Sequence, residues 1–289
     1  MASTVTLIIA GLALGAIYAL VATGYSIVYL ASESFNFAHS QLMVAGAFVA
    51  YEMLAVAKAP AALAILATVA CVAVLAVIEE RVAIRLVKDP HTQLLTTIGV
   101  ATLLGGVCTV IWGDEPLFVP PIVGSQAVNV FGGNVTPTDI ALIALAIAVT
   151  GFVMLLVKRT RAGLAILAIA EDPEAARLVG VNNRALVLGA FAFSGAIAGL
   201  AGLFMAPQTF AVVSSGQTLS IQGFVAAALG GFGSIPGGLI GGFATGIISE
   251  VVIRYAGGVY ANTVVLALLL TFLLIKPSGL FGRLQERVV

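Results

Sequence analysis

Residues 185–249 read ALVLGAFAFSGAIAGLAGLFMAPQTFAVVSSGQTLSIQGFVAAALGGFGSIPGGLIGGFATGIIS, without a single Asp, Glu, Lys or Arg. In water so much apolar surface would drive aggregation, whereas the hydrocarbon core of a bilayer is a matching solvent for it. The whole chain follows this pattern, since 61% of its 289 residues are hydrophobic and 9% are charged, against roughly 25% charged residues in soluble domains. The sequence therefore predicts a membrane-embedded protein.

Apolar runs bounded by charges, glycines and prolines predict the membrane spans, each of which needs about 20 mostly apolar residues. The run at 221–235 is short, and a re-entrant half-helix there would leave eight full spans instead of nine. The predicted fold class is thus an all-α, polytopic transmembrane bundle of eight or nine spans, forming one transmembrane domain over 1–289. The predicted spans are about 5–30, 40–57, 61–79, 92–112, 139–157, 187–206, 221–235, 238–255 and 259–275.

The positive charges predict the orientation, because Lys and Arg gather in cytoplasmic loops. The order of the spans puts most of them on one side, and only Lys58 and Arg254 fall opposite. We therefore expect a cytoplasmic 80s loop, 158–186 loop and C-terminus, with the N-terminus outside. The bases expected in the cytoplasm are Arg81, Arg85, Lys88, Lys158, Arg159, Arg161, Arg177, Arg184, Lys276, Arg283 and Arg287.

Pairs of glycines four residues apart are frequent in the predicted spans. Such pairs put two glycines on one helix face and let backbones approach closely, which is a main source of helix association where lipid supplies no hydrophobic drive. The pattern predicts a tightly packed bundle. The pairs are Gly11/Gly15, Gly195/Gly199, Gly237/Gly241, Gly238/Gly242 and Gly242/Gly246.

The sequence lacks the signatures of several classes of function. The net charge is zero, so no basic field indicates nucleic acid. There is no G-x-x-x-x-G-K-[ST] phosphate loop, no H-E-x-x-H, and no metal-ligand spacing around Cys71 or Cys108. We therefore predict a non-enzyme that binds no metal or cofactor itself, with any ATP handled by another subunit.

The segment 163–183, GLAILAIAEDPEAARLVGVNN, is the most specific polar stretch of the chain. Asp172 suits an N-cap, Pro173 the first helical position, Glu174 the positive helix end, and Gly180 a left-handed stop. The short helix between them either only covers helix ends or docks in a groove of a partner protein. The candidate docking residues are Glu171, Asp172, Pro173, Glu174, Ala175, Ala176, Arg177 and Gly180.

Four ordered blocks resemble the branched-chain amino acid (LivH-type) permeases of ABC importers. They are GLALGAIYALVATGYSIVYLASESFNFAHSQLMVAGAF near the N-terminus, the 163–183 segment, AALGGFGSIPGGLIGG at 227–242 and KPSGLFGR at 276–283. The resemblance covers nearly the full length, and Ser40 departs from it where many relatives carry glycine. It implies the importer-permease fold, with 163–183 as the coupling loop that contacts the ATPase.

The resemblance also implies partners and a substrate class. A second homologous permease, two cytoplasmic ATPases that bind the ATP, and a periplasmic substrate-binding protein would complete an importer in the inner membrane. Its substrates would be branched-chain or other small amino acids, with urea or short amides as the alternative within the family. The alternative from another class is a secondary amino acid transporter, although the paired intramembrane carboxylates typical of such carriers are missing.

Two polar or glycine-rich breaks are candidates for the pathway or its gate. The first holds Asn36, Phe37 and His39, and Asn36 either faces the substrate at a broken helix or simply caps the next helix in a cytoplasmic turn. The second is either a tight turn between helices or a flexible gate, since its glycines and proline do not form a regular helix. Its candidate residues are Gly230, Gly231, Gly233, Ser234 and Gly237.

Overall fold

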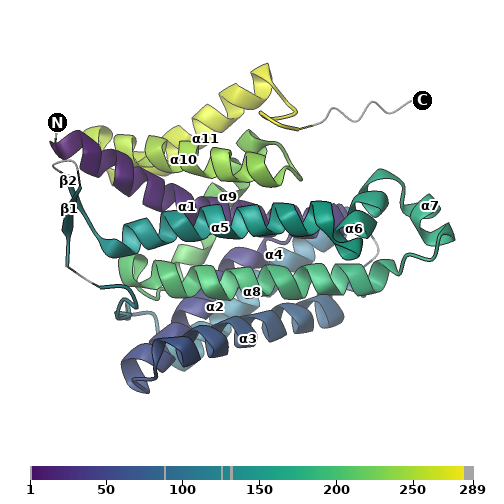
Figure 1. Ribbon diagram of the computed structural model, residues 1–289, viewed down its shortest axis with the longest axis horizontal. Helices are drawn as coiled ribbons and strands as arrows, with labels where there is room; N and C mark the ends of the chain where they lie inside the picture. The colour runs from purple at the N-terminus through teal and green to yellow at the C-terminus, as the bar shows by residue number, and fades with distance from the viewer. Residues whose placement is uncertain (1, 88, 125, 131–132, 283–289) are drawn as a thin grey trace.

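The protein is a bundle of long helices, shown in Figure 1. The computed structural model describes residues 2–87, 89–124, 126–130 and 133–282. The helices are α1 (Ala2–Ser32), α2 (Ala38–Tyr51), α3 (Ala61–Glu79), α4 (Pro90–Trp112), α5 (Pro137–Arg159), α6 (Arg161–Glu171), α7 (Pro173–Leu178), α8 (Asn183–Thr209), α9 (Ser215–Gly230), α10 (Ile235–Ala256) and α11 (Gly258–Ile275).

Short irregular elements complete the fold. A π-helical turn at Glu52–Val56 extends α2, and another at Glu80–Ile84 extends α3. The strands β1 (Val128–Val130) and β2 (Gly133–Val135) form an antiparallel hairpin between α4 and α5.

Seven helices in the described part of the chain are long and apolar enough to cross a membrane, namely α1, α3, α4, α5, α8, α10 and α11. Every predicted span overlaps a helix, and the two remaining spans correspond to α2 with its π turn and to α9. With 16 residues, α9 is about 24 Å long at ~1.5 Å per residue, shorter than the ~30 Å hydrocarbon core. The all-α bundle is confirmed, with seven full-length candidate spans and two shorter buried helices.

The boundaries predicted for α9 are wrong. The helix runs over Ser215–Gly230 and not over 221–235. It begins early because Gly216 packs against the Gln41 side chain of α2, which draws the polar segment before Ile221 into the bundle. It ends at Gly230 because Gly231 takes a left-handed conformation with φ of 97°.

Hydrogen bonds to side chains define the starts of two spans. Thr136 and Asp139 form a reciprocal capping box at α5, in which the Asp139 amide donates to Thr136 Oγ1 and the Thr136 amide donates to the Asp139 carboxylate. Asp89 caps α4 by accepting from the Thr92 amide at 2.8 Å. The Thr92 hydroxyl also donates to this carboxylate, and the hydrogen bonds from the Thr92 hydroxyl and amide hold the pKa of the exposed Asp89 carboxyl below its usual range.

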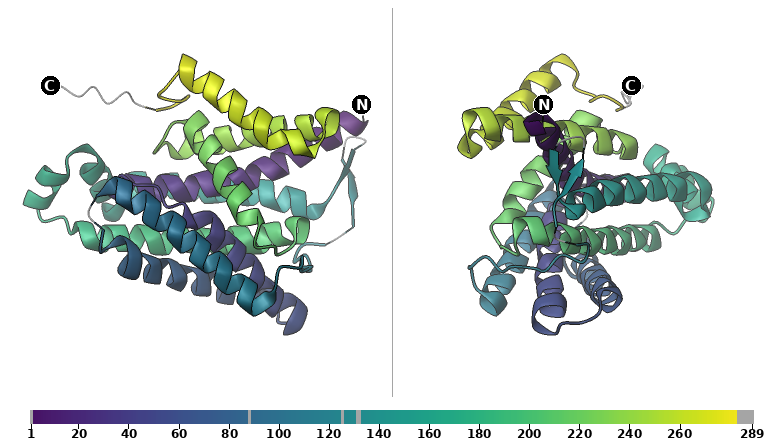
Figure 2. Two further views of the ribbon diagram at one scale, coloured as in Figure 1. Left: turned by 180° about the vertical axis from the view of Figure 1, so that it is seen from behind. Right: turned by 60° about the vertical axis from the view of Figure 1, so that its left-hand side comes forward.

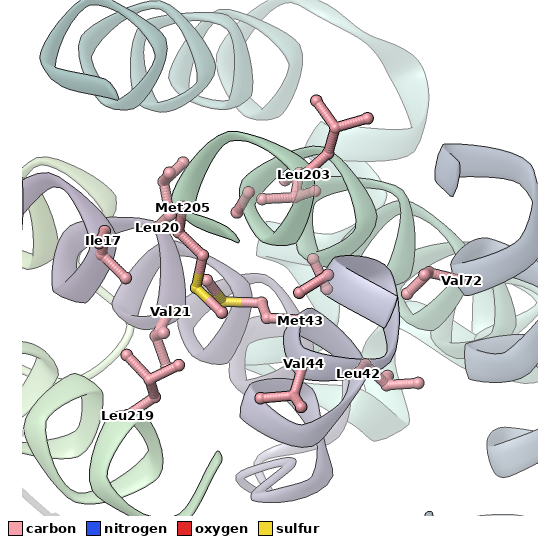
Figure 3. Close-up of a cluster of buried hydrophobic side chains, with 14 of the residues drawn as sticks. Ile17, Leu20, Val21, Leu42, Met43, Val44, Val72, Leu203, Met205 and Leu219 are labelled. Atoms are coloured by element: carbon pink, nitrogen blue, oxygen red, sulfur yellow. The ribbon is translucent and has the colours of Figure 1, made fainter. Parts of the chain in front are cut away.

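The helices form a buried centre and a lipid-facing shell. α1 packs against α5, α8, α9 and α10, and α2 packs against α3, α4, α8 and α9. α3, α4, α5 and α11 expose most of their surface, and Figure 2 shows α4 and α11 on opposite sides of the bundle. Figure 3 shows α1, α2 and α8 meeting where Met43 and Met205 point toward each other, and the flexible thioethers suit such an irregular gap.

Glycines bring α1 and α10 into backbone contact. A Cβ on Gly15 would lie 2.7 Å from the Gly242 carbonyl oxygen, and a Cβ on Gly11 would lie 2.9 Å from the Cα of Ile247. Gly246 packs against the backbone of Gly15 on the same face. The close packing predicted from the glycine spacing is therefore confirmed at this interface. Gly199 of α8 likewise packs against the backbone of Thr68 in α3.

The two ends of the bundle differ in character. The start of α1 and the β1–β2 hairpin lie at one end, and α6 and α7 lie at the other (Figure 1). Arg85 and Arg184 line one cavity, so the 80s loop and the 158–186 loop share an end as predicted, whereas Arg254 lies with Thr4 at the other. Lys88, Arg283 and Arg287 lie outside the described residues, and the Arg177 side chain is not described.

We expect Gly15→Val to destabilise the protein by about 1–3 kcal/mol, because the added side chain would push α10 away from α1. The midpoint of heat-induced unfolding, followed by size-exclusion chromatography in detergent, should fall. Gly106→Val is the matched control, since a Cβ on Gly106 of α4 meets nothing within 4 Å. Equal midpoints for the two variants would contradict the role of the α1–α10 contact.

Candidate functional site

The coupling segment, Arg161–Asn182, leaves the bundle as two short helices. Gly163 lets α6 fold back on α5, because a Cβ there would collide with the backbone of Val157. α7 packs against α6, and Figure 1 shows both projecting at one end of the molecule. The predicted short helix therefore exists, and it protrudes beyond the spans.

The predicted signals at both ends of α7 are confirmed. Asp172 caps the helix, since the Ala175 amide donates to its Oδ1 at 3.0 Å. Gly180 ends the segment with φ of 87°, a conformation that favours glycine. Glu171 ends α6 and is exposed, as are Asp172 and Ala175, whereas Ala176 is buried against the rest of the segment. The backbone of Pro173, Glu174 and Arg177 lies in α7, but their side chains lie outside the described residues.

Asn36 organises the corner between α1 and α2, defined here as residues 33–37. Its Oδ1 accepts from the Ala38 amide at 2.9 Å, and its Nδ2 donates to Glu79 Oε2 of α3 at 3.1 Å. The residue is 1% exposed. Asn36 therefore binds the first amide of α2, although Phe37 occupies the N-cap position itself, and both ends of the Asn36 amide have partners within the chain.

His39 is enclosed by the bundle. Its Nδ1 and Ser194 Oγ of α8 share a hydrogen bond of 2.8 Å, and the ring is fully buried. Gly24 of α1 makes room for it, since a Cβ there would collide with the imidazole. His39 thus joins α1, α2 and α8 and does not face an open passage in this conformation.

Six rings form an aromatic cluster at the corner, made of Tyr25, Tyr29, Phe35, Phe37, Phe224 and Phe232. Tyr29 stacks on Phe35 with centroids 4.7 Å apart, and Phe35 meets Phe232 edge-on at 4.8 Å. Phe37 lies 5.6 Å from Phe224 of α9. Five of the six rings are only half-buried, so the cluster forms part of the surface of this subunit.

The glycine-rich block is a tight turn, as one of its two interpretations predicted. Gly230 is the buried last residue of α9, and Gly231 and Gly233 have φ of 97° and 75°. Ser234 then caps α10 by accepting from the Gly237 amide at 3.2 Å. Gly230 and Gly237 pack backbone against backbone, so both ends of the turn are held.

The C-terminal block rests on this turn. The Leu280 amide donates to the Leu229 carbonyl at 2.9 Å, and the Phe281 amide donates to the Gly230 carbonyl at 3.0 Å. These bonds satisfy carbonyls at the end of α9 that have no partner within the helix. Three distant blocks of sequence, around residues 35, 232 and 280, thus form one structural unit.

The two predicted pathway segments therefore meet through Phe35 and Phe232, and the coupling segment contributes none of the rings at that contact. Of the six rings, sequence reasoning named only Phe37 as a site residue. Tyr25 and Tyr29 are four apart on α1, a spacing that puts both on one helix face. No local signal connects them to Phe224 and Phe232, because that contact depends on how α9 packs.

Comparison with known proteins identifies the family. Residues 7–275 match the family described as branched-chain amino acid transport system, permease component. The chain is 30% identical to the high-affinity branched-chain amino acid transport permease LivH of Escherichia coli K12, and 28% identical to BraD of Pseudomonas aeruginosa. Each comparison covers 94% of both chains. The chain therefore belongs to this family of ABC transport permeases.

The fold agrees with this assignment. PsaBC from Streptococcus pneumoniae, solved in complex with a Fab, has a similar fold with a TM-score of 0.53 at 10% identity, over 94% of this chain and 92% of that one. The protein is thus a multi-pass membrane protein and a transporter subunit, not the ATPase itself. A permease of an ABC transport system implies ATPase and binding-protein partners.

We expect Asn36→Leu to cost about 1–3 kcal/mol of stability, because it leaves the buried Glu79 carboxyl without a hydrogen-bond partner in the described part of the chain. Transport should fall while membrane insertion is retained. The double variant Asn36→Leu/Glu79→Leu should recover part of the loss, since removing both polar groups leaves neither unsatisfied. Additive losses in thermal unfolding would show that the two side chains act independently.

Proposed function

We propose that this chain is one of two permease subunits of an ATP-driven importer that carries branched-chain or other small amino acids into the cytoplasm. The observation that carries the proposal is the match to the permease family over residues 7–275. Two cytoplasmic ATPases would bind the ATP, a second homologous permease would complete the pathway, and a periplasmic binding protein would deliver the substrate. The whole chain, 1–289, would act as one transmembrane unit in the inner membrane.

The proposed topology puts the coupling segment and the C-terminus in the cytoplasm and the N-terminus outside. Basic residues from the 80s loop and the 158–186 loop lie at the same end of the bundle, and positive charge marks the cytoplasmic side of membrane proteins. Arg254 and the start of α1 share the opposite end.

In this proposal α7 is the coupling helix that docks on an ATPase. Leu178 and Val179 at its end are 89% and 80% exposed. Large aliphatic side chains that project from a membrane protein into water favour a partner groove that covers them. The Asp172 cap and the Gly180 stop keep the helix short and fix the direction in which these side chains point.

The aromatic cluster is our proposed gate at the cytoplasmic end of the pathway. Its rings come from α1, the corner, α9 and the glycine turn, so a shift of α9 against α1 would separate them. Each aromatic pair contributes about 0.5–1.5 kcal/mol, which is small enough for ATP-driven movement to open and close the cluster. Within it, Phe37 belongs to the corner that Asn36 and His39 anchor, and the segment Gly230–Gly237 holds Phe232.

The substrate and the energy source are tested together. Cells lacking this chain should lose ATP-dependent uptake of labelled leucine, isoleucine or valine and regain it on complementation. Uptake of urea or short amides instead would indicate the alternative substrate class of the family. Uptake that persists without the partner ATPase would indicate a secondary transporter and contradict the proposal.

We expect Asp172→Leu to reduce uptake and co-purification of the ATPase by about tenfold, because loss of a helix cap costs ~1 kcal/mol or more in a six-residue helix. Asp172→Asn is the matched control, since Asn caps helices as well as Asp. Gly180→Leu should act like Asp172→Leu, and Gly180→Asn should be milder because Asn tolerates positive φ. Normal co-purification of the ATPase with both Asp172→Leu and Gly180→Leu would contradict the proposal that α7 is the coupling helix.

We expect Phe37→Ala to uncouple transport, so that ATP hydrolysis continues while substrate uptake falls, because the gate would no longer close around Phe224. Uptake and ATPase activity of the reconstituted transporter measure this ratio. Phe152→Ala is the control, since its ring pairs with Phe193 away from the aromatic cluster. An unchanged ratio of hydrolysis to uptake in Phe37→Ala would contradict the gate and indicate that the cluster only packs the helices together.

A further inference from the structure

A cavity of about 310 Å³ opens at the end of the bundle that carries the coupling segment. Its walls come from the end of α1, the π turn after α3, the start of α4, α6 and the start of α8. The volume lies at the lower end of the ~300–1,000 Å³ typical of small-molecule sites. The aromatic cluster does not contribute to its lining.

Three residues of the lining each have a buried side-chain oxygen that accepts no hydrogen bond from the described part of the chain. The atoms are Glu80 Oε2, Gln93 Oε1 and Asn183 Oδ1. Glu80 is only 4% exposed. The orientation of Gln93 is fixed, because its Nε2 donates to the Val87 carbonyl at 2.8 Å and leaves the oxygen free. Buried acceptors without donors are unfavourable, so an occupant that donates hydrogen bonds would stabilise these three residues if their side chains turned toward it.

The charges of the lining are balanced. Glu33 and Glu80 supply two carboxylates, and Arg85 and Arg184 supply two guanidinium groups. A simple cation would be repelled by the arginines, and a simple anion by the glutamates. The lining is otherwise mainly aliphatic, from Ala31, Ile84, Val87, Ile169 and Val187. Balanced charge beside an aliphatic wall complements a zwitterion that has a small apolar side chain.

We propose that this cavity binds an aliphatic α-amino acid from the cytoplasm and that its binding slows transport. The ammonium group, with three donors, would meet the three free oxygens of Glu80, Gln93 and Asn183. The carboxylate would pair with Arg85 and Arg184, whose planar guanidinium groups suit it. The proposal rests on the proposed function, since the ligand would be the imported product.

The position of the cavity explains how binding would act on transport. Ile169 belongs to α6 of the coupling segment, and Asn183 follows that segment directly. The opposite wall belongs to α1 and the π turn of the bundle. A ligand held between these walls favours the arrangement in which they lie close, so it resists any movement of the coupling segment away from the bundle.

Binding is tested with labelled L-leucine on the intact chain in lipid nanodiscs. Arg85→Ala and Glu80→Gln should each weaken binding about tenfold, as expected for loss of a charged hydrogen bond. Arg81→Ala is the matched control, because Arg81 is exposed on the same π turn and does not line the cavity. Leucine analogues that lack the carboxylate or the ammonium group should compete poorly.

The transport effect is tested in proteoliposomes that contain the complete transporter, with its cytoplasmic side facing the lumen. Luminal L-leucine should lower the initial rate of uptake in the wild type and have little effect in Arg85→Ala. Absent leucine binding, or equal loss in Arg81→Ala and Arg85→Ala, would overturn the proposal. Binding that Phe37→Ala abolishes and Arg85→Ala retains would assign the ligand to the pathway, which overturns this site but leaves the importer function intact.

Discussion

The backbone contact between α1 and α10 is the constraint on which the rest of this structure depends. Lipid tails are as apolar as the helices, so burying Leu or Val side chains between helices brings little gain in a bilayer. Gly15, Gly242 and Gly246 have no side chains, so the backbones of α1 and α10 pack directly against each other. This contact places α1 at the centre, where it also packs against α5, α8 and α9.

Two buried polar side chains join helices at the centre of the bundle. Asn36 connects the corner to Glu79 of α3, and His39 connects α2 to Ser194 of α8. Both bonds cross between elements far apart in the sequence, and in a low-dielectric interior an unpaired group is costly. They hold the corner in position within the aromatic cluster.

The coupling segment and the cavity lie at the same end of the molecule. The coupling segment projects from that end, and the cavity beside it is lined by both the end of α1 and the start of α8. The C-terminal block covers the glycine turn through Leu280 and Phe281. Ile169 of the coupling segment and Glu33 of the corner line the same cavity, so these two parts of the molecule are neighbours.

The sequence alone determined the features that depend on local chemistry. Long uncharged runs required a bilayer, Asp172 and Gly180 defined a short helix, and ordered motifs indicated a family that the match over residues 7–275 then confirmed. Tertiary structure alone decided where α9 begins, that Asn36 bonds to Glu79, and that Phe35 meets Phe232. The physical reason is that caps and hydropathy act within a few residues, whereas these contacts arise only once glycine-rich helices have packed and brought distant side chains together.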